Sequence, residues 1–135
     1  MKILILDDKP ERQAEFRSHA PADSVVVFAQ TPAEAIALLE QQDWDLVFLE
    51  HDLGGGLFLA ENDPRSGQRV AEWLASHPER MPKRTVLHSP NDEGRSRMHL
   101  VLPEAISLSH AWTFPISEPK RDSHSLPIYY PLEDE

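Results

Sequence analysis

The sequence predicts an α/β fold, a three-layer sandwich with a five-stranded parallel sheet between two layers of helices. Two observations support it. Short apolar runs at 2–6, 25–28, 46–49 and 85–87 lack polar alternation, which is typical of strands buried on both faces. The segments between them carry helix-capping residues and apolar positions at helical spacing, so strands and helices alternate. Right-handed crossovers then favour the strand order 2-1-3-4-5.

The elements of the first half follow from their end signals. After the strand at 2–6, Asp8-Lys-Pro-Glu11 has the pattern of a capping box, with a proline suited to the first helical turn. A strand at 25–28 comes next. Thr31-Pro-Ala-Glu34 is a stronger capping box, and the helix that follows has one apolar face, made of Ala35, Ile36, Leu38 and Leu39. The strand at 46–49 completes this half.

The second half begins with a long loop at about 53–65, and Ser66 is expected to cap the next helix. Val70, Trp73 and Leu74 of that helix should face inward. A strand at 85–88, a helix from about 91 to 102 and a weaker strand at 111–114 complete the expected order.

The segment after Ser117 has no amphipathic pattern, and it contains Pro119, Pro127 and Pro131 before an acidic end. An interior proline costs a helix about 3 kcal/mol, so no fifth helix is expected here. We therefore predict one α/β domain at 1–116 and a tail at 117–135, which is either a strap across the domain or a disordered acidic segment.

Composition excludes several functions. The chain has 135 residues, enough for one domain with a core, and no cysteine, so disulfides and thiolate ligands are excluded. Its formal net charge of -10 argues against binding along duplex nucleic acid. No apolar stretch reaches membrane-spanning length, so we expect a soluble, cytoplasmic protein without a membrane partner.

Acidic and imidazole side chains stand where three of the predicted strands end. In an open parallel sheet the ligand sits outside the carboxyl ends of the strands, so we expect these side chains to share one pocket. Several carboxylates this close raise a pKa or recruit a cation. The residues are Asp7, Asp8, Glu50, His51, Asp52, His88 and Ser89.

We assign Asp7, Asp8, Glu50 and Asp52 as metal ligands, although Asp8 also fits a helix cap. Glu50 and Asp52 are two apart, so both project to one side if the strand stays extended, and either is also a candidate base for a water. The His51 side chain could project to either side of the strand.

The phosphate side of the pocket is assigned to His88, Ser89 and Asn91. His88 would act either as a general acid or as a donor to a non-bridging oxygen. Ser89 and Asn91 also suit capping of the next helix, whose N-terminus with Gly94 is a natural anion site. Arg12 is interpreted as pairing with a neighbouring acid.

The acid pair Asp7-Asp8, the acidic residue that closes the third strand and the hydroxyl residue after the fourth resemble a response-regulator receiver domain, over residues 1–116. That resemblance implies a flavodoxin/receiver-like fold in which the acid pair holds Mg²⁺ and an Asp accepts phosphate. A Ser or Thr and a Lys neutralise the phosphoryl oxygens there. In this chain Glu50 stands at the acceptor position and Phe114 where the Lys would be.

A divergent branch of the receiver domains is more similar to this chain. Leu4-Ile-Leu-Asp-Asp8 with Arg12, then His51-Asp-Leu53, then His88-Ser-Pro-Asn91 with Gly94 and Met98, resemble the cyclic-phosphate-processing receiver-like domains. That resemblance implies cleavage or binding of cyclic phosphates with metal-binding acids and an added histidine. The branch is expected to carry Asp where this chain has Glu50.

Two functions follow as hypotheses. The first is metal-dependent binding or hydrolysis of a cyclic phosphate on a nucleotide or an RNA end. Mg²⁺ or Mn²⁺ would polarise a phosphoryl oxygen, and His88, Glu50 and Asp52 would be catalytic. The alternative is an atypical receiver or pseudo-receiver that signals through a protein partner.

Overall fold

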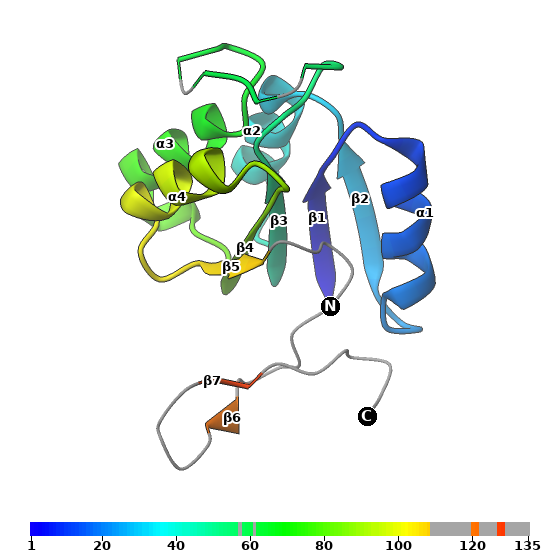
Figure 1. Ribbon diagram of the computed structural model, residues 1–135. Coiled ribbons are helices and arrows are strands. Elements are labelled where there is room, and N and C mark those ends of the chain that lie inside the picture. The colour runs from blue at the N-terminus through cyan, green and yellow to red at the C-terminus, as the bar shows by residue number, and fades with distance from the viewer. Residues whose placement is uncertain (57, 61, 109–119, 122–126, 129–135) are drawn as a thin grey trace.

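The structure, a computed structural model, describes residues 1–56, 58–60, 62–108, 120–121 and 127–128. Strands and helices alternate along the chain, and the sheet stands at the centre (Figure 1). The strands of the main sheet are β1 Lys2–Leu6, β2 Val25–Ala29, β3 Leu46–Glu50, β4 Arg84–His88 and β5 Ile106–Leu108. The helices are α1 Pro10–His19, α2 Pro32–Gln41, α3 Gln68–Ser76, the short 3-10 helix η1 Pro78–Arg80 and α4 Asp92–Val101.

The sheet has five parallel strands in the order β2-β1-β3-β4-β5, so the predicted fold class and strand order are confirmed. β1 lies between β2 and β3, and Ile5 is opposite Phe28 on one side and Phe48 on the other. In the next pair, Glu50 is directly opposite His88. This order makes the C-terminal ends of β1, β3 and β4 neighbours at one edge of the sheet.

The last strand of the sheet begins earlier than predicted. β5 is formed by Ile106–Leu108, next to β4, whereas the sequence favoured 111–114, which lie outside the described residues. In this pair Ile106 is opposite Val86 and Leu108 is opposite His88. Phe114, which the resemblance places at the receiver lysine, also lies outside the described residues, so that match stays a prediction.

Two helix starts follow the sequence signals. The Thr31 hydroxyl accepts the Glu34 N–H at 3.2 Å, and the Glu34 carboxylate accepts the Gln30 N–H at 2.9 Å, which completes a reciprocal cap on α2. At α4, the Asn91 side chain accepts the Gly94 N–H at 2.9 Å.

Two other starts differ from the prediction. The residue before α1 is Lys9, without a side-chain cap, because the Asp8 carboxylate accepts the Gly54 N–H at 2.7 Å instead. The residue before α3 is Gly67 in place of Ser66, although the Ser66 hydroxyl still accepts the Gln68 N–H at 3.2 Å. A Cβ at Gly67 would lie 2.0 Å from the Glu50 carbonyl oxygen, so only glycine allows the start of α3 to come this close to the end of β3.

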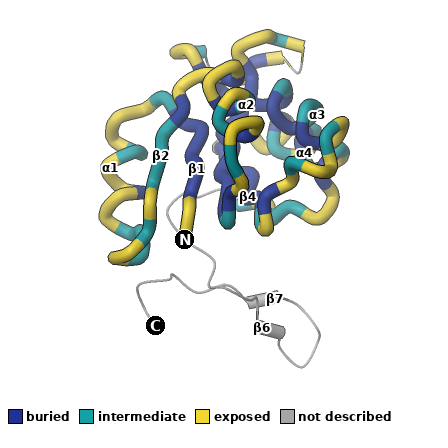
Figure 2. Tube along the Cα trace, turned by 180° about the vertical axis from the view of Figure 1, so that it is seen from behind, coloured by how far each residue is buried: buried dark blue, intermediate teal, exposed yellow. Residues whose placement is uncertain are grey.

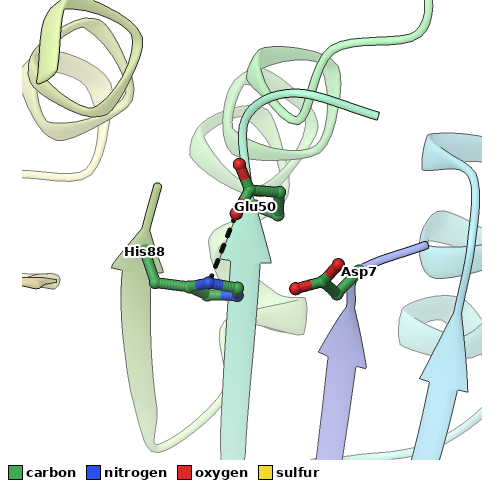
Figure 3. Close-up of side chains that lie close together, drawn as sticks. All are labelled: Asp7, Glu50 and His88. Carbon is green, nitrogen blue, oxygen red and sulfur yellow. Dashed lines mark ion pairs between the residues drawn. The ribbon is translucent and has the colours of Figure 1, made fainter. Parts of the chain in front are cut away.

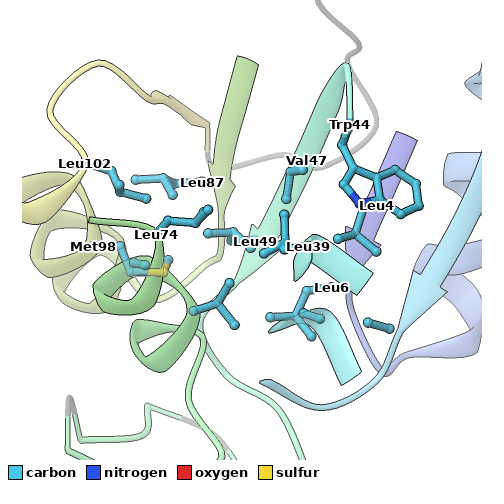
Figure 4. Close-up of a cluster of buried hydrophobic side chains, with 14 of the residues drawn as sticks. Leu4, Leu6, Leu39, Trp44, Val47, Leu49, Leu74, Leu87, Met98 and Leu102 are labelled. Carbon is cyan, nitrogen blue, oxygen red and sulfur yellow. The ribbon is translucent and has the colours of Figure 1, made fainter. Parts of the chain in front are cut away.

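Alternate residues of the strands enter two apolar clusters on opposite faces of the sheet. The larger cluster packs under α2, α3 and α4 and contains Leu4, Val47 and Leu49 from the sheet (Figure 4). The smaller cluster lies on the face that carries α1, and its members are Ile3, Ile5, Phe16, Leu46, Phe48 and Val86. The buried strands between partly exposed helices appear in Figure 2. We call the face of the sheet that carries the smaller cluster and α1 the α1 face.

The predicted tail is described only in part. Lys120–Arg121 (β6) pairs antiparallel with Pro127–Ile128 (β7), and no helix follows β5 in the described part of the chain. The division at residue 116 stays a prediction. None of the helices in the described segments has the length and apolar character needed to cross a membrane.

Candidate functional site

Three side chains from neighbouring strand ends meet on the α1 face (Figure 3). Asp7 directly follows β1, Glu50 ends β3 and His88 ends β4. Because side chains two apart in a strand share a face, Asp7 continues the row of Ile3 and Ile5. Each of the three is at most 1% exposed, and one ligand atom from each lies within 4.8 Å of the others. We call Asp7, Glu50 and His88 the strand-end cluster.

Arg12 of α1 supplies a positive charge to this cluster. Its Nε donates to Asp7 Oδ2 at 2.6 Å and its Nη2 donates to Asp7 Oδ1 at 3.0 Å. Nη2 also lies 3.6 Å from Glu50 Oε2. The backbone N–H of Lys9 donates to Asp7 Oδ1 at 3.0 Å. Both oxygens of Asp7 are therefore engaged, and the interpretation that Arg12 pairs with a neighbouring acid is confirmed.

Glu50 is a buried carboxyl with one satisfied and one unsatisfied oxygen. Oε1 accepts the Ser89 hydroxyl at 2.8 Å and the Asp52 N–H at 3.2 Å. Oε2 has no hydrogen-bond partner among the described residues. Burial raises the pKa of Glu50 to about 7, against the opposing effects of the Arg12 charge and the Ser89 hydrogen bond. Glu50 is thus poised to gain or lose a proton near neutral pH.

The His88 ring is held between aromatic side chains. Its centroid lies 5.3 Å from that of Phe16 and 5.8 Å from that of Phe48, both edge-to-face. Burial and, to a smaller extent, the nearby charge of Arg12 lower the pKa of His88 to about 3. The ring is therefore neutral at physiological pH. The approach of Nδ1 to Glu50 Oε2 at 3.5 Å, dashed in Figure 3, is then a polar contact and not a charged pair.

The strand-end cluster fits a divalent metal ion. It offers two carboxylates and one imidazole, a set that protein metal sites use. Two buried polar atoms, Glu50 Oε2 and His88 Nε2, have no hydrogen-bond partner in the described part of the chain. Buried polar atoms are nearly always paired, so unpaired ones at a strand-end cluster indicate a place for a ligand.

Asp52 belongs to a different network. Its carboxylate accepts from Asn91 Nδ2 at 3.2 Å and from the N–H groups of Phe58 and Leu59 at 2.8 and 3.1 Å, and it lies 2.8 Å from His51 Nδ1. Burial acts to raise the pKa of Asp52, but these hydrogen bonds lower it overall. Phe58 has the left-handed φ of 52°, which a phenylalanine rarely adopts, so Asp52 holds a strained turn of the loop.

The predicted alternation of Glu50 and Asp52 fails because β3 ends at Glu50 and the chain then turns. His51 is fully buried, and a Cβ on Gly94 would lie 2.6 Å from its ring. The Gly94 N–H is taken by Asn91. The N-terminus of α4 is therefore packed at Gly94 and capped by Asn91, and its use as an anion site stays a prediction.

The structure thus brings together Asp7, Glu50 and His88, with Ser89 hydrogen-bonded to Glu50. It places Asp8 on Gly54, and Asp52 and Asn91 in the loop network. The ligand roles of Asp8 and Asp52, and the phosphate roles of Ser89 and Asn91, stay predictions of the sequence. In the sequence, the signal for Arg12 was its spacing of five from Asp7, in the first turn of a helix that begins beside the site.

Replacing Asp52 with Asn tests its assignment as a loop anchor. We expect faster amide hydrogen exchange at Phe58 and Leu59, because a neutral amide is a weaker acceptor for their N–H groups. The rise in melting temperature that Mg²⁺ or Mn²⁺ is expected to give the wild-type protein should persist in this variant. Asp63→Asn, which alters a loop carboxylate paired with Arg65, is the matched control. A variant that keeps protected amides but loses cation binding would instead make Asp52 a ligand.

Comparison with known proteins decides the family. Residues 2–104 match the sequence model described as the cyclic-phosphate processing receiver domain. This chain belongs to that family. No match was found among curated proteins.

Solved structures similar to this cyclic-phosphate processing receiver domain are receiver domains of response regulators. A CheY-like receiver domain protein from Methanospirillum hungatei is 18% identical over 82% of each chain, with a TM-score of 0.60. The phosphorylated cyanobacterial phytochrome response regulator RcpA is 18% identical, over 82% of this chain and 81% of that one, with a TM-score of 0.65. TrrA from Thermotoga maritima, in complex with Mg²⁺ and BeF, is 21% identical over 80% and 86%, with a TM-score of 0.60. These likenesses establish the fold.

Proposed function

We propose that this cyclic-phosphate processing receiver domain binds a cyclic phosphate at the strand-end cluster, together with Mg²⁺ or Mn²⁺, and opens the ring by hydrolysis. The observation that carries the proposal is the buried pair of unpartnered atoms, Glu50 Oε2 and His88 Nε2, in a cluster with Asp7. The family match supports the ligand class. A small nucleotide or a single RNA end suits a chain with a net charge of -10 better than a duplex does.

Asp7, Glu50 and His88 are the residues that would hold the cation. When bound, the cation would polarise a phosphoryl oxygen and offset the negative charge of the phosphate. The carboxylates cannot hold a phosphate alone, because like charges repel. Cation and phosphate are therefore expected to bind together.

Hydrolysis requires that a water attack phosphorus, that the water lose a proton, and that one ring P–O bond break with protonation of its oxygen. Glu50 suits both proton transfers, because its carboxyl lies within the cluster and has an unpartnered oxygen, Oε2. It would take the proton from water and return it to the leaving oxygen. His88, with its pKa lowered to about 3, is a poor general acid and suits the other predicted role, donating a hydrogen bond to a non-bridging oxygen.

His88→Gln is expected to lower kcat/KM for 2′,3′-cyclic nucleotides by about 100-fold or more, because it removes the imidazole at the phosphate. Chromatography of the monophosphate products, with Mg²⁺ or Mn²⁺ and with a chelator, measures the rate. His19→Gln changes a histidine at the far end of α1 and should leave the rate unchanged. Wild-type protein that neither turns over nor binds a cyclic nucleotide with any cation would refute the function.

The alternative function, an atypical receiver that signals to a protein partner, is favoured by the likeness of the fold to response regulators. In its response-regulator form this alternative requires Glu50 to accept a phosphoryl group, whereas a pseudo-receiver would signal without one. The Glu50 pKa of about 7 leaves much of the carboxyl protonated, and therefore poorly nucleophilic, at neutral pH. Treatment with a small phosphodonor and Mg²⁺ separates the two functions, because a stable acyl phosphate detected by mass spectrometry would support signalling.

A further inference from the structure

Arg12 occupies the acids that a cation would need. Its guanidinium bonds both oxygens of Asp7, at 2.6 and 3.0 Å, and lies 3.6 Å from Glu50 Oε2. In the protein without a metal, one side chain therefore supplies the positive charge for two of the three residues of the cluster. The Arg12 side chain is 20% exposed, so solvent reaches part of it.

Cation and guanidinium cannot both keep these contacts. A cation at the cluster needs an oxygen of Asp7, and the two oxygens already accept Arg12 and the Lys9 N–H. Two positive charges held on one buried carboxylate repel strongly. Binding of the cation must therefore release at least one of the two bonds from Arg12 to Asp7.

We propose that Arg12 is exchanged for the cation, and that the released guanidinium then binds the phosphate. This inference rests on the proposed function. Arg12 lies in the first turn of α1, next to the end of β1, so its side chain stays beside the cluster after the exchange. Its planar fork matches two phosphate oxygens and carries a permanent positive charge.

A second arginine near the site is fixed elsewhere. Arg95 donates to the Ser89 carbonyl and to the Ser107 hydroxyl, and it pairs with Asp92 at 2.9 Å. These contacts hold its guanidinium without involving a carboxylate of the cluster. The exchange with a cation is therefore assigned to Arg12.

The exchange predicts opposite effects of one substitution. Arg12→Gln removes the competitor, so the Kd for Mg²⁺ alone should fall by about tenfold or more, as expected for loss of a charge-assisted pair. With Mg²⁺ saturating, the Kd for inorganic phosphate should rise by about tenfold or more. Arg12→Lys, a point charge without the fork, should lie between wild type and Gln in both measurements. Isothermal titration calorimetry gives both constants.

Arg17→Gln is the matched control. Arg17 lies on the same helix with its guanidinium over the Phe28 ring, 4.7 Å from the centroid, and both constants should match wild type. In wild-type protein the Arg12 Nε–Hε signal is a second readout by NMR. It should lose its exchange protection on addition of Mg²⁺ and regain it with phosphate.

The outcomes separate the two proposals. Wild-type protein that binds no Mg²⁺ would overturn both. Wild-type protein that binds Mg²⁺ and phosphate, with Arg12→Gln weakening Mg²⁺ or leaving both constants unchanged, would overturn the exchange and leave the function standing. An Arg12 Nε–Hε signal unchanged by saturating Mg²⁺ overturns the exchange even if the Gln variant fails to fold.

Discussion

Replacing Asp7 with Asn is expected to abolish the rise in melting temperature that a divalent cation gives to the wild-type domain. A cation that binds only the folded state, at about 100 times its Kd, adds about 2.7 kcal/mol, or roughly 10 °C for a domain of this size. Asn keeps the shape of Asp7 but removes the charge at one corner of the strand-end cluster. Thermal unfolding with and without millimolar Mg²⁺ or Mn²⁺ measures the difference.

Asp8→Asn is the control that distinguishes the two adjacent acids. The Asp8 carboxylate accepts the Gly54 N–H, and Asp8 lies outside the strand-end cluster. The variant should keep most of the cation-induced shift. If Asp8→Asn abolishes the shift and Asp7→Asn keeps it, the metal ligand is Asp8 and not Asp7. If the cation leaves the wild-type melting temperature unchanged, there is no cation site.

Replacing Glu50 with Gln is expected to stabilise the metal-free protein above pH 7 and to have little effect at pH 4. The pKa of Glu50 is raised from 4.5 to about 7 in the folded state. The protonated form is therefore the stable one, and wild-type stability falls as the pH rises from 4.5 through 7. The loss is about 3 kcal/mol, which Gln avoids because it carries no charge to bury.

The pH profile of the Gln variant should expose an opposite effect of His88. The pKa of His88 is lowered from 6.5 to about 3, so its contribution is present above pH 6.5 and is lost as the pH falls toward 3. In wild type the two effects oppose each other between pH 4.5 and 6.5. Urea unfolding at several pH values in chelator measures this: the Gln variant should weaken with acid where wild type stays nearly level. Parallel profiles of the two proteins would contradict the buried charge at Glu50.

The fold was predictable because its signals are local and repeated. Four apolar runs without alternation define strands buried on both faces, and the Thr31 and Asn91 caps mark helix starts that the structure confirms. The start of the last strand was missed because the described part of this edge strand, Ile106–Leu108, has little hydrophobic pattern. The position of this strand depends on its pairing with β4, which is not a local property of the sequence.

The site was predictable as far as strand ends determine it. Asp7, Glu50 and His88 could be expected together, because parallel neighbours place their last residues at one edge. The directions of the Asp8 and Asp52 side chains could not be predicted, because they depend on where each strand ends and on the hydrogen bonds of the loop at 53–65. A turn that begins one residue after Glu50 sends Asp52 to the loop, and no periodicity in the sequence marks that turn.

Glu50 is positioned by two kinds of force that respond differently to salt. On one side the start of α3 abuts its carbonyl oxygen, where only Gly67 leaves room, and this contact is steric. On the other side Arg12, 3.6 Å from Oε2, acts by charge and is partly open to solvent. Ionic strength screens the second and leaves the first untouched. Rising salt therefore weakens the attraction of Arg12 only as far as solvent reaches it, while the backbone of β3 stays where α3 has set it.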